Sequence, residues 1–385
     1  MPDKLLKEFR NRFHNETAQL FFCPGRVNLI GEHIDYNGGK VMPCAISSGT
    51  YLVIAKNADK KIRFQCMNFP EKAELHLQSS YSKTGKQWFN YPLGVINQLL
   101  QNGHAISGLD MLFVGDLPIG AGLSSSASIE VLTAFALNEL YQFNISKVDI
   151  ALLSKKSENE FIGVNCGIMD QFAVAMGQKD KAILLNCDTL EYEYLPFKTG
   201  EYSLIVINSR KQRSLEDSRY NERFAECGAA LKLLKTQLDL QHLCDLDVKT
   251  FEAYRHLIDD SVLQKRALHV ISENERVKEA AAALKSGDLA GFGKLMYASH
   301  QSLKELYEVS GFELDVIIDF CKTYSNCIGA RMTGAGFGGS VIALVKKKSY
   351  IDFAARSESY YTHMIGYKPE IFDSEIGDGV TEIKF

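Results

Sequence analysis

Several patterns that would define a class of protein are missing from this sequence. Lys and Arg number 43 against 47 Asp and Glu, a formal net charge of -4, so there is no basic excess for non-specific nucleic-acid binding. No apolar run approaches the length of a membrane span, and residues 1–13 are charged throughout, without a secretory apolar region. We therefore expect neither a nucleic-acid partner nor a membrane.

The cysteines follow no metal-binding or disulfide pattern. All nine are scattered singly, and no Cys-x-x-Cys occurs, which argues against a zinc site. An odd number of unpatterned cysteines in a long chain is typical of reduced thiols, so we expect a cytoplasmic protein. Neither an internal repeat nor a low-complexity tract is present.

Two common nucleotide-binding motifs are also missing. The phosphate loop Gly-x-x-x-x-Gly-Lys-Ser/Thr requires a Gly-Lys-Ser/Thr sequence that does not occur, and Gly-x-Gly-x-x-Gly fails because Ser125 replaces its third glycine. What the chain does have is 385 residues, 46% hydrophobic and 23% charged, which is globular composition and enough for two domains of ordinary size.

The most informative stretch is Pro118–Ile129, which reads Pro-Ile-Gly-Ala-Gly-Leu-Ser-Ser-Ser-Ala-Ser-Ile. It follows an apolar run typical of a strand at Met111–Val114 and precedes a helical pattern. Glycines in such a turn let the backbone approach a ligand, and a helix N-terminus with three hydroxyls suits phosphate. An ordinary Gly/Ser turn with a serine N-cap is the alternative, but two glycines and three serines favour phosphate binding.

A second polar segment follows a predicted strand near the N-terminus. It reads Pro-Gly-Arg-Val-Asn-Leu-Ile-Gly-Glu-His-Ile-Asp-Tyr-Asn-Gly-Gly over residues 24–39. Glu32, His33 and Asp35 could be metal ligands, but no second histidine lies at helical spacing to complete such a site. They could equally form a solvated loop or a polyol site, because a buried sugar needs partners for all its hydroxyls.

Four further residues have an ordinary structural interpretation when each is considered by itself. Glu158, near the end of a helix predicted over Val148–Phe161, would by itself be a surface carboxylate. Asp170, in the first turn of a short helix that ends at Gly177, could simply complement the helix dipole. Trp88, the only tryptophan, could be a packing residue, and Tyr220 an amphipathic aromatic.

A family resemblance connects these segments. The Pro-x-x-x-Gly-Leu-Ser-Ser-Ser-Ala loop resembles that of the GHMP kinases, and residues 24–39 closely resemble the galactokinase signature within that superfamily. Cys-Gly-Ile-Met-Asp-Gln at 166–171 and the glycine-rich segment at 329–340 are also similar to galactokinases. The resemblance runs from about Phe21 to Val345, with no substitution at a motif position that would undermine activity.

The resemblance implies an α+β fold of two domains, with mixed sheets backed by helices and the active site in the cleft between the domains. We expect an N-terminal domain over residues 1–197, with the sugar signature and the phosphate loop, and a C-terminal GHMP kinase domain over 198–385. We expect a monomer. The segment at 329–340 would lie beside the active site and shape it, and we assign it no catalytic residue.

The implied reaction transfers a phosphoryl group from ATP, with Mg²⁺, to the anomeric hydroxyl of α-D-galactose, in galactose catabolism. Asp170 would be the catalytic carboxylate, and Arg26 would stabilise developing charge. The sugar would bind to Glu32, His33, Ile34, Asp35, Gly167 and Tyr220. The nucleotide would bind to Gly120, Ala121, Gly122, Leu123, Ser124, Ser125, Ser126 and Trp88. Mg²⁺ would bind to Ser126 and Glu158.

Other functions remain compatible with the same motifs. A related kinase for N-acetylgalactosamine or arabinose would share these loops and differ only in the shape of the sugar pocket. A mevalonate kinase would lack Gly-Glu-His-Ile-Asp-Tyr. A galactose sensor that binds ATP and sugar without turnover is the alternative outside enzymes; a shortened serine run would indicate it, and here the run is intact.

Overall fold

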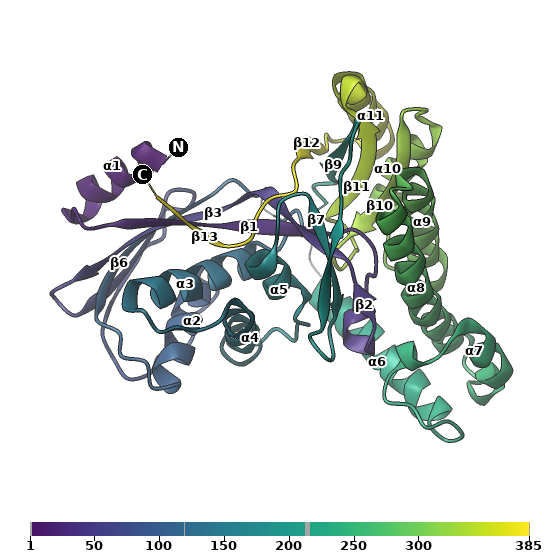
Figure 1. The fold of residues 1–385 in the computed structure, drawn as a ribbon, viewed down its shortest axis with the longest axis horizontal. Coiled ribbons are helices and arrows are strands. Elements are labelled where there is room, and N and C mark those ends of the chain that lie inside the picture. The colour runs from purple at the N-terminus through teal and green to yellow at the C-terminus, as the bar shows by residue number, and fades with distance from the viewer. Residues whose placement is uncertain (1, 119, 212–215, 385) are drawn as a thin grey trace.

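The computed structural model describes residues 2–118, 120–211 and 216–384 of the chain. Ile119, in the glycine-serine loop, lies outside the described residues. The chain contains both helices and several sheets, which confirms the predicted α+β class (Figure 1). Within the described ranges, none of the helices is both long and apolar enough to cross a membrane.

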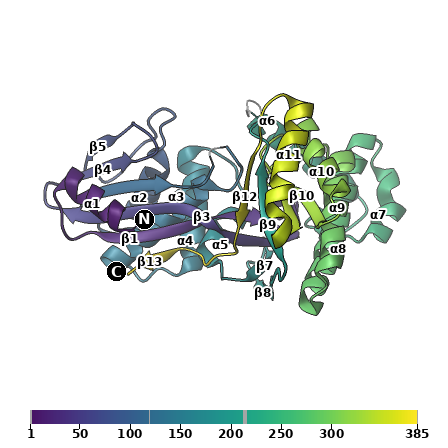
Figure 2. The same ribbon diagram turned by 90° about the horizontal axis from the view of Figure 1, so that it is seen from above.

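The largest sheet has six strands in the order β13-β1-β3-β6-β4-β5, and only the β4–β6 pair is parallel. Its strands are β1 (Gln19–Asn28), β3 (Pro43–Asn57), β4 (Lys61–Cys66), β5 (Ala73–His76), β6 (Gly108–Gly115) and β13 (Thr381–Ile383). The last strand brings the C-terminal end of the chain back to β1, near helix α1, as Figure 2 shows from above.

Helices cover both faces of this sheet. Helix α1 (Pro2–Phe13) packs its apolar side, Leu5, Leu6 and Phe9, on one face. The other face is covered by α2 (Asn90–Gln101), α3 (Ser125–Tyr141), α4 (Lys147–Ser157) and α5 (Met169–Met176) (Figure 1). Helix α3 contacts β1 and β3 above it and α2, α4 and α5 around it, so the helix that follows the glycine-serine loop is fixed inside the core.

The remaining strands form two smaller sheets. One contains β2 (Lys40–Val41), β7 (Lys181–Asn186) and β8 (Tyr192–Pro196). The other has the order β10-β11-β9-β12 and contains β9 (Tyr202–Asn208), β10 (Cys327–Thr333), β11 (Ser340–Lys346) and β12 (Glu370–Ser374). The helices of this part are α6 (Glu216–Leu234), α7 (Val248–Tyr254), α8 (Ser261–Ser286), α9 (Leu289–Ser302), α10 (Phe312–Thr323) and α11 (Tyr350–Ile365).

Long-range packing overrides several local boundaries predicted from the sequence. The patterns at Val41–Ile46 and Tyr51–Ala55 predict two strands, but a single strand, β3, runs from Pro43 through the second of them, because it pairs with β1 along one edge and β6 along the other; Val41 belongs to β2. The helix predicted over Val148–Phe161 keeps its Ser146 cap, which accepts from the Asp149 N–H, but ends at Ser157. A π-helical turn, Glu158–Ile162, replaces its last part.

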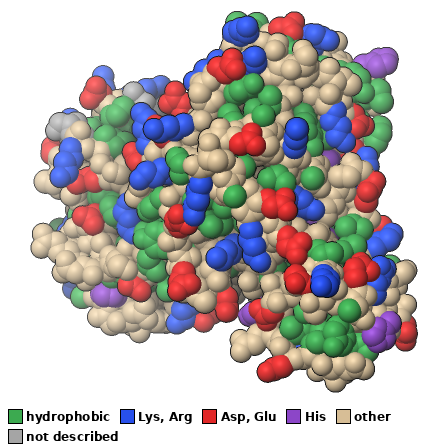
Figure 3. Space-filling view, turned by 45° about the vertical axis from the view of Figure 1, so that its right-hand side comes forward, with side chains coloured by type: hydrophobic (Ala, Val, Ile, Leu, Met, Phe, Trp, Pro, Cys, Tyr) green, Lys and Arg blue, Asp and Glu red, His purple; other side chains and the backbone are tan. Residues whose placement is uncertain are grey.

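The surface shows no segregation of charge on the face drawn in Figure 3. Acidic and basic side chains are interspersed there, with small hydrophobic groups between them. This distribution agrees with the near balance of Lys and Arg against Asp and Glu in the whole sequence.

Candidate active site

A cavity of about 250 Å³ lies where the predicted N-terminal and C-terminal parts meet. We call it the first cavity. Tyr220, Gly334 and Ala335 line it from the C-terminal side. The remaining lining residues come from the N-terminal side: Arg26, Glu32, His33, Asp35, Glu158, Val164, Asn165, Cys166, Gly167, Met169 and Asp170.

An arginine–carboxylate pair forms one wall of the first cavity. Arg26 Nε and Nη2 donate to the two oxygens of Asp170 at 2.7 and 2.5 Å, and Nη1 donates to the Gly122 carbonyl at 2.8 Å. The Ser124 hydroxyl also donates to Asp170. Such a two-pronged contact fixes the orientation of both groups. The structure therefore unites β1, the glycine-serine loop and α5 at one carboxylate.

The local backbone explains how Arg26 reaches this position. The β1–β3 register shifts between Pro24 and Arg26, and a bulge of this kind redirects the side chains of a strand. A Cβ atom on Gly25 would lie 2.7 Å from the Leu123 carbonyl oxygen, so glycine is needed for the loop to approach β1. The Arg26 N–H donates to that same carbonyl at 3.1 Å.

Two further acidic side chains line the first cavity. Glu32 is buried and Asp35 partly so, and their removal from water raises the pKa of both carboxyls, that of Asp35 to about 7. The negative charges of Asp170 and Glu32 raise the Asp35 pKa further, while Arg331 is the strongest influence that lowers the Glu32 pKa. A Cβ atom on Gly167 would lie 2.2 Å from Asp35 Oδ2, so the backbone at 167 packs directly against this carboxylate.

His33 also lines the first cavity, but both ring nitrogens already have protein partners. Nε2 lies 3.0 Å from the Ala335 carbonyl, which can only accept, so Nε2 carries the proton. Nδ1 then accepts from the Tyr36 hydroxyl at 2.9 Å in the neutral ring. Burial lowers the His33 pKa to about 3, which keeps the ring neutral. The ring therefore shapes the wall, with Tyr220 5.8 Å away between ring centroids.

Ile34, which the sequence predicts as a sugar-binding residue, does not line either of the two cavities described in this section. Its side chain is fully buried and packs against Gly39, where an added Cβ would lie 2.8 Å from it. The residue lies between Glu32 and Asp35 in the chain, and its burial anchors the loop that presents them.

A second cavity, of about 210 Å³, lies on the other side of the loop and is mostly apolar. Trp88, Ser125 and Ser126, which the sequence predicts to bind the nucleotide, line this cavity. Trp88 contacts Phe113 edge to face at 5.5 Å and donates its Nε1–H to the Glu71 carbonyl. The sequence assigned no role to the other lining residues, although Tyr91 lies in the Trp88 segment that resembles the adenine-pocket segment of galactokinases; they are Thr50, Cys66, Asn68, Phe69, Tyr91, Phe113, Gly115, Leu117 and Ile129.

Ser126 and Glu158, far apart in sequence, meet between the two cavities. Ser126 lines the second cavity and Glu158 the first, and the two side chains are neighbours, since Ser126 favours the ionised form of the Glu158 carboxyl and so lowers its pKa. The π-helical turn places Glu158 here, and such turns are frequent at functional sites. Gln171 donates to the same carboxylate, and burial, with the Asp170 charge, raises the Glu158 pKa.

These groups fit a magnesium ion only if a ligand completes its shell. The described residues contain no cluster of three or more His, Cys, Asp or Glu that could hold a metal. One carboxylate and one hydroxyl are nevertheless oxygen ligands that suit Mg²⁺, which keeps waters and substrate phosphates as its other ligands. The fully buried carboxyl of Glu130 lies beside Glu158, and burial together with the Glu158 charge raises the Glu130 pKa well above its usual range, so Glu130 adds no second carboxylate to this set.

The backbone of the glycine-serine loop adopts the left-handed conformation at three residues. Gly120 and Gly122 both have φ of +72°, in the left-handed region that favours glycine. Ser124 shares this conformation at φ +63°, although it is not glycine, and helix α3 begins at the next residue. Strain of this kind is retained where a site requires it, and here it directs the Ser124 hydroxyl to Asp170.

Known proteins share both the motifs and this architecture. Residues 90–178 match the GHMP kinases N terminal domain, residues 280–359 match the GHMP kinases C terminal domain, and residues 7–56 match the galactokinase galactose-binding signature. Crystal structures of mevalonate kinase and of homoserine kinase from Cytophaga hutchinsonii have TM-scores of 0.67 and 0.62 at 20% and 14% identity, which supports the fold alone.

The fold and both domain matches are those of a GHMP kinase. Galactokinases of Clostridium tetani and Enterococcus faecalis are each 48% identical to this chain, over 99% and 100% of it and 97% and 100% of their own lengths. The structure of Lactococcus lactis galactokinase complexed with galactose has a TM-score of 0.96 at 42% identity, covering 99% of this chain and 100% of that one. The chain belongs to the galactokinase family.

Proposed function

We propose that this chain transfers the γ-phosphoryl group of ATP to the anomeric hydroxyl of α-D-galactose, which gives α-D-galactose 1-phosphate and ADP. The observation that carries this proposal is the meeting of two cavities at Ser126 and Glu158, with the Arg26–Asp170 pair on one side. A polar cavity with acidic walls suits a sugar, and a mostly apolar one beside a glycine-serine loop suits a base and its phosphates.

The first cavity would hold the sugar. Glu32 and Asp35 would accept hydrogen bonds from its hydroxyls, and Tyr220 would close the cavity from the C-terminal side. Gly167 would leave room for Asp35, and the buried Ile34 would hold the loop that carries both carboxylates. His33, neutral and fixed by Ala335 and Tyr36, would form part of the wall.

Asp170 and Arg26 would carry the chemical step. Asp170 would accept the hydrogen bond of the anomeric hydroxyl, orient its oxygen for in-line attack and provide the acceptor for its proton. Arg26 would hold Asp170 in place and stabilise the negative charge that develops on the phosphoryl oxygens. Phosphoryl transfer depends mainly on such positioning and charge stabilisation.

The second cavity would hold the nucleotide. Trp88 would pack against the adenine, and backbone N–H groups of Gly120, Ala121, Gly122, Leu123, Ser124, Ser125 and Ser126 would face the phosphates. Glu158 and the Ser126 hydroxyl would hold Mg²⁺. When bound, this ion would offset the negative charge of the phosphates.

Three further expectations are part of the proposal. The division into 1–197 and 198–385 is supported by the first cavity, which is lined from both parts. The monomeric state expected from the sequence stays a prediction. The cytoplasmic location expected from the sequence stays a prediction.

Release of ADP with Mg-ATP and a panel of acceptors tests the function. We expect turnover with galactose, and little or none with N-acetylgalactosamine, arabinose, glucose or mevalonate. Faster turnover with one of the other acceptors would assign a related kinase instead. Binding of galactose and ATP without any ADP release would indicate a sensor.

A further inference from the structure

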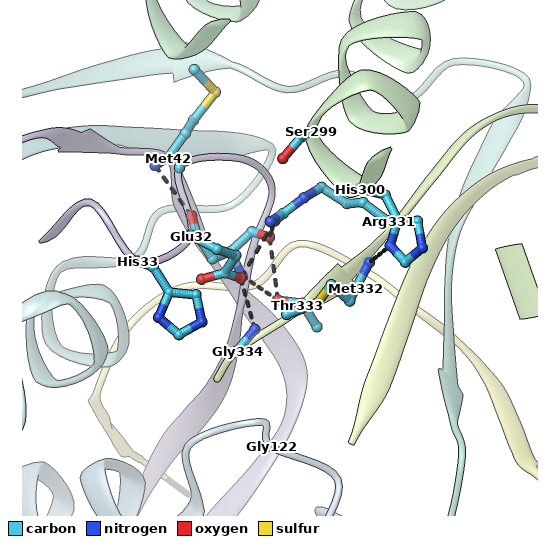
Figure 4. A network of polar contacts seen from close by, with 12 residues as sticks. Glu32, His33, Met42, Gly122, Ser299, His300, Arg331, Met332, Thr333 and Gly334 are labelled. Carbon is cyan, nitrogen blue, oxygen red and sulfur yellow. Dashed lines mark hydrogen bonds and ion pairs between the residues drawn. The ribbon is translucent and has the colours of Figure 1, made fainter. Parts of the chain in front are cut away.

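Glu32 is held by a short segment whose first residue, Arg331, has no role in the proposed function. This segment, Arg331–Ala335, forms the end of β10 and the turn after it, and it lies alongside Asn28–His33. The Gly334 N–H donates to Glu32 Oε1 at 2.7 Å, and Arg331 Nη1 lies 3.4 Å from the same oxygen. Figure 4 shows Glu32 between the Arg331 guanidinium and Gly334.

Arg331 is unusual for a residue of this size and charge. It is completely buried, and its Nη1 donates to the Asn28 carbonyl at 2.9 Å as well as approaching Glu32. Its Nε and Nη2 have no partner among the described residues. A buried charge without a counterion is costly, and Glu32 is the only carboxylate recorded as its ion-pair partner in the described ranges.

The same segment fixes the backbone that carries Glu32. The Asn28 N–H donates to the Thr333 hydroxyl at 2.9 Å, and His33 Nε2 donates to the Ala335 carbonyl. The backbone is thus held on both sides of Glu32 by contacts that do not involve Arg331. Removal of the guanidinium should therefore release the Glu32 side chain more than the loop.

We propose that Arg331 is a positioning residue for sugar recognition: it holds the Glu32 carboxylate at the first cavity in the orientation that accepts one particular sugar hydroxyl. This inference rests on the proposed function, because it takes the first cavity as the sugar site. Arg331 itself does not line that cavity, so its effect on the sugar passes through Glu32. A guanidinium suits this task because it is always charged, and its Nη1 is anchored by the Asn28 carbonyl while it approaches Glu32 Oε1.

The alternative is that Arg331 only stabilises the fold. Kinetics with galactose and its 2-, 3-, 4- and 6-deoxy analogues separate the two roles. In the wild type, removal of the hydroxyl that Glu32 binds should lower kcat/KM. In Glu32→Gln, the same removal should lower kcat/KM by a smaller factor. Arg331→Met should likewise reduce the factor by which removal of that hydroxyl lowers kcat/KM. It should also raise KM for galactose about tenfold or more, with KM for ATP unchanged.

Arg63→Met is the matched control. Arg63 also pairs with a nearly buried carboxylate, Asp110, at 2.9 Å, but it does not line either cavity. We expect it to leave the pattern across the deoxy sugars as in the wild type. If Arg331→Met does not fold, Arg331→Lys takes its place, because an ammonium keeps the charge without the rigid planar guanidinium that places Nη1; it should weaken the same hydroxyl preference by a smaller factor.

Two results would overturn the inference. One is a uniform fall in kcat/KM for all five sugars in the Arg331 variant, with the wild-type pattern retained. The other is a changed preference for a different hydroxyl from the one that Glu32→Gln affects. Failure of the proposed function is distinct, since the wild type itself would then not phosphorylate galactose.

Discussion

Asp170 is held by three hydrogen bonds, two from Arg26 and one from Ser124, before any substrate arrives. Two nitrogens of Arg26 and the hydroxyl of Ser124 bind its carboxylate, and its side chain still keeps 31% of its surface exposed toward the first cavity. A carboxylate so fixed needs little reorganisation when a hydroxyl approaches. Its charge, rather than its shape, should therefore decide turnover.

Asp170→Asn tests this directly, because it keeps the shape and removes the charge. We expect kcat to fall by roughly 10²-fold or more, a typical scale for the loss of a general base. Thermal melting should show a folded protein, and galactose binding by calorimetry should persist. Near-wild-type turnover in a folded variant would remove Asp170 from the catalytic role.

The Asp35 pKa of about 7 predicts a pH-dependent stability that does not depend on function. The native state keeps the proton up to about pH 7, whereas the unfolded state loses it near 3.8. Its contribution to the free energy of unfolding thus falls as pH rises from about 4 to about 7, by up to about 4 kcal/mol at 1.4 kcal/mol per pKa unit.

Asp35→Asn removes this titration, so the variant should gain stability relative to the wild type at pH 8 and gain less at pH 5. Urea denaturation of both proteins at the two pH values measures the difference. An equal difference at pH 5 and pH 8 would mean that Asp35 has an ordinary pKa in the native protein.

At this scale the sequence predicts identities better than contacts. Arg26 and Asp170 could be named because they lie in recognisable motifs, and Glu158 through the family resemblance alone; the structure brings all three to one cavity. The occupied nitrogens of His33 depend on Tyr36 and Ala335, and Ala335 lies about three hundred residues away. The burial of Ile34 likewise follows from packing that no local pattern encodes.

Among the elements, α4 shows how a local irregularity creates a site. Its pattern predicts a continuous helix to Phe161, yet the last turn widens, and the Gly163 N–H donates to the Glu158 carbonyl. The widening goes with tertiary contacts, because Gln171 of α5 donates to the Glu158 carboxylate and Ser126 of α3 is its neighbour. Element types were thus predictable from periodicity, whereas this turn was not.

The metal assignment predicts a specific defect when this turn loses its carboxylate. Glu158→Gln should raise the Mg²⁺ concentration for half-maximal activity by about tenfold or more, since the ion loses its protein carboxylate. Galactose binding without nucleotide should stay unchanged. Glu160→Gln is the control, because Glu160 lies on the same turn but is largely exposed. A Mg²⁺ titration of Glu158→Gln that follows the wild-type curve would show that the ion is held elsewhere.

Across the whole molecule, the two predicted domains are joined by several contacts and not only by the chain that runs from one to the other. Strand β13 returns to pair with β1, and just before it the Val380 N–H donates to the Val174 carbonyl of α5. The Gly31 N–H binds Glu273 of α8, and the Ser340 hydroxyl binds the Ala121 carbonyl in the glycine-serine loop. The order of the sequence alone suggests two consecutive units, because it cannot show that the end of the chain pairs with its beginning.

This interlocking predicts that the two parts unfold together. Trp88, the only tryptophan, reports on the N-terminal part, while far-ultraviolet circular dichroism reports on all helices, including the long α8 and α9. We expect coincident midpoints from both signals. Galactose at about 100 times its Kd should raise both by the equivalent of about 2.7 kcal/mol. Val380→Ala, at a fully buried position, should lower both by the equivalent of about 2 kcal/mol. Separate midpoints, or a Val380→Ala effect on the fluorescence signal alone, would mean that β13 and the contacts at Gly31 and Ser340 do not couple the two parts.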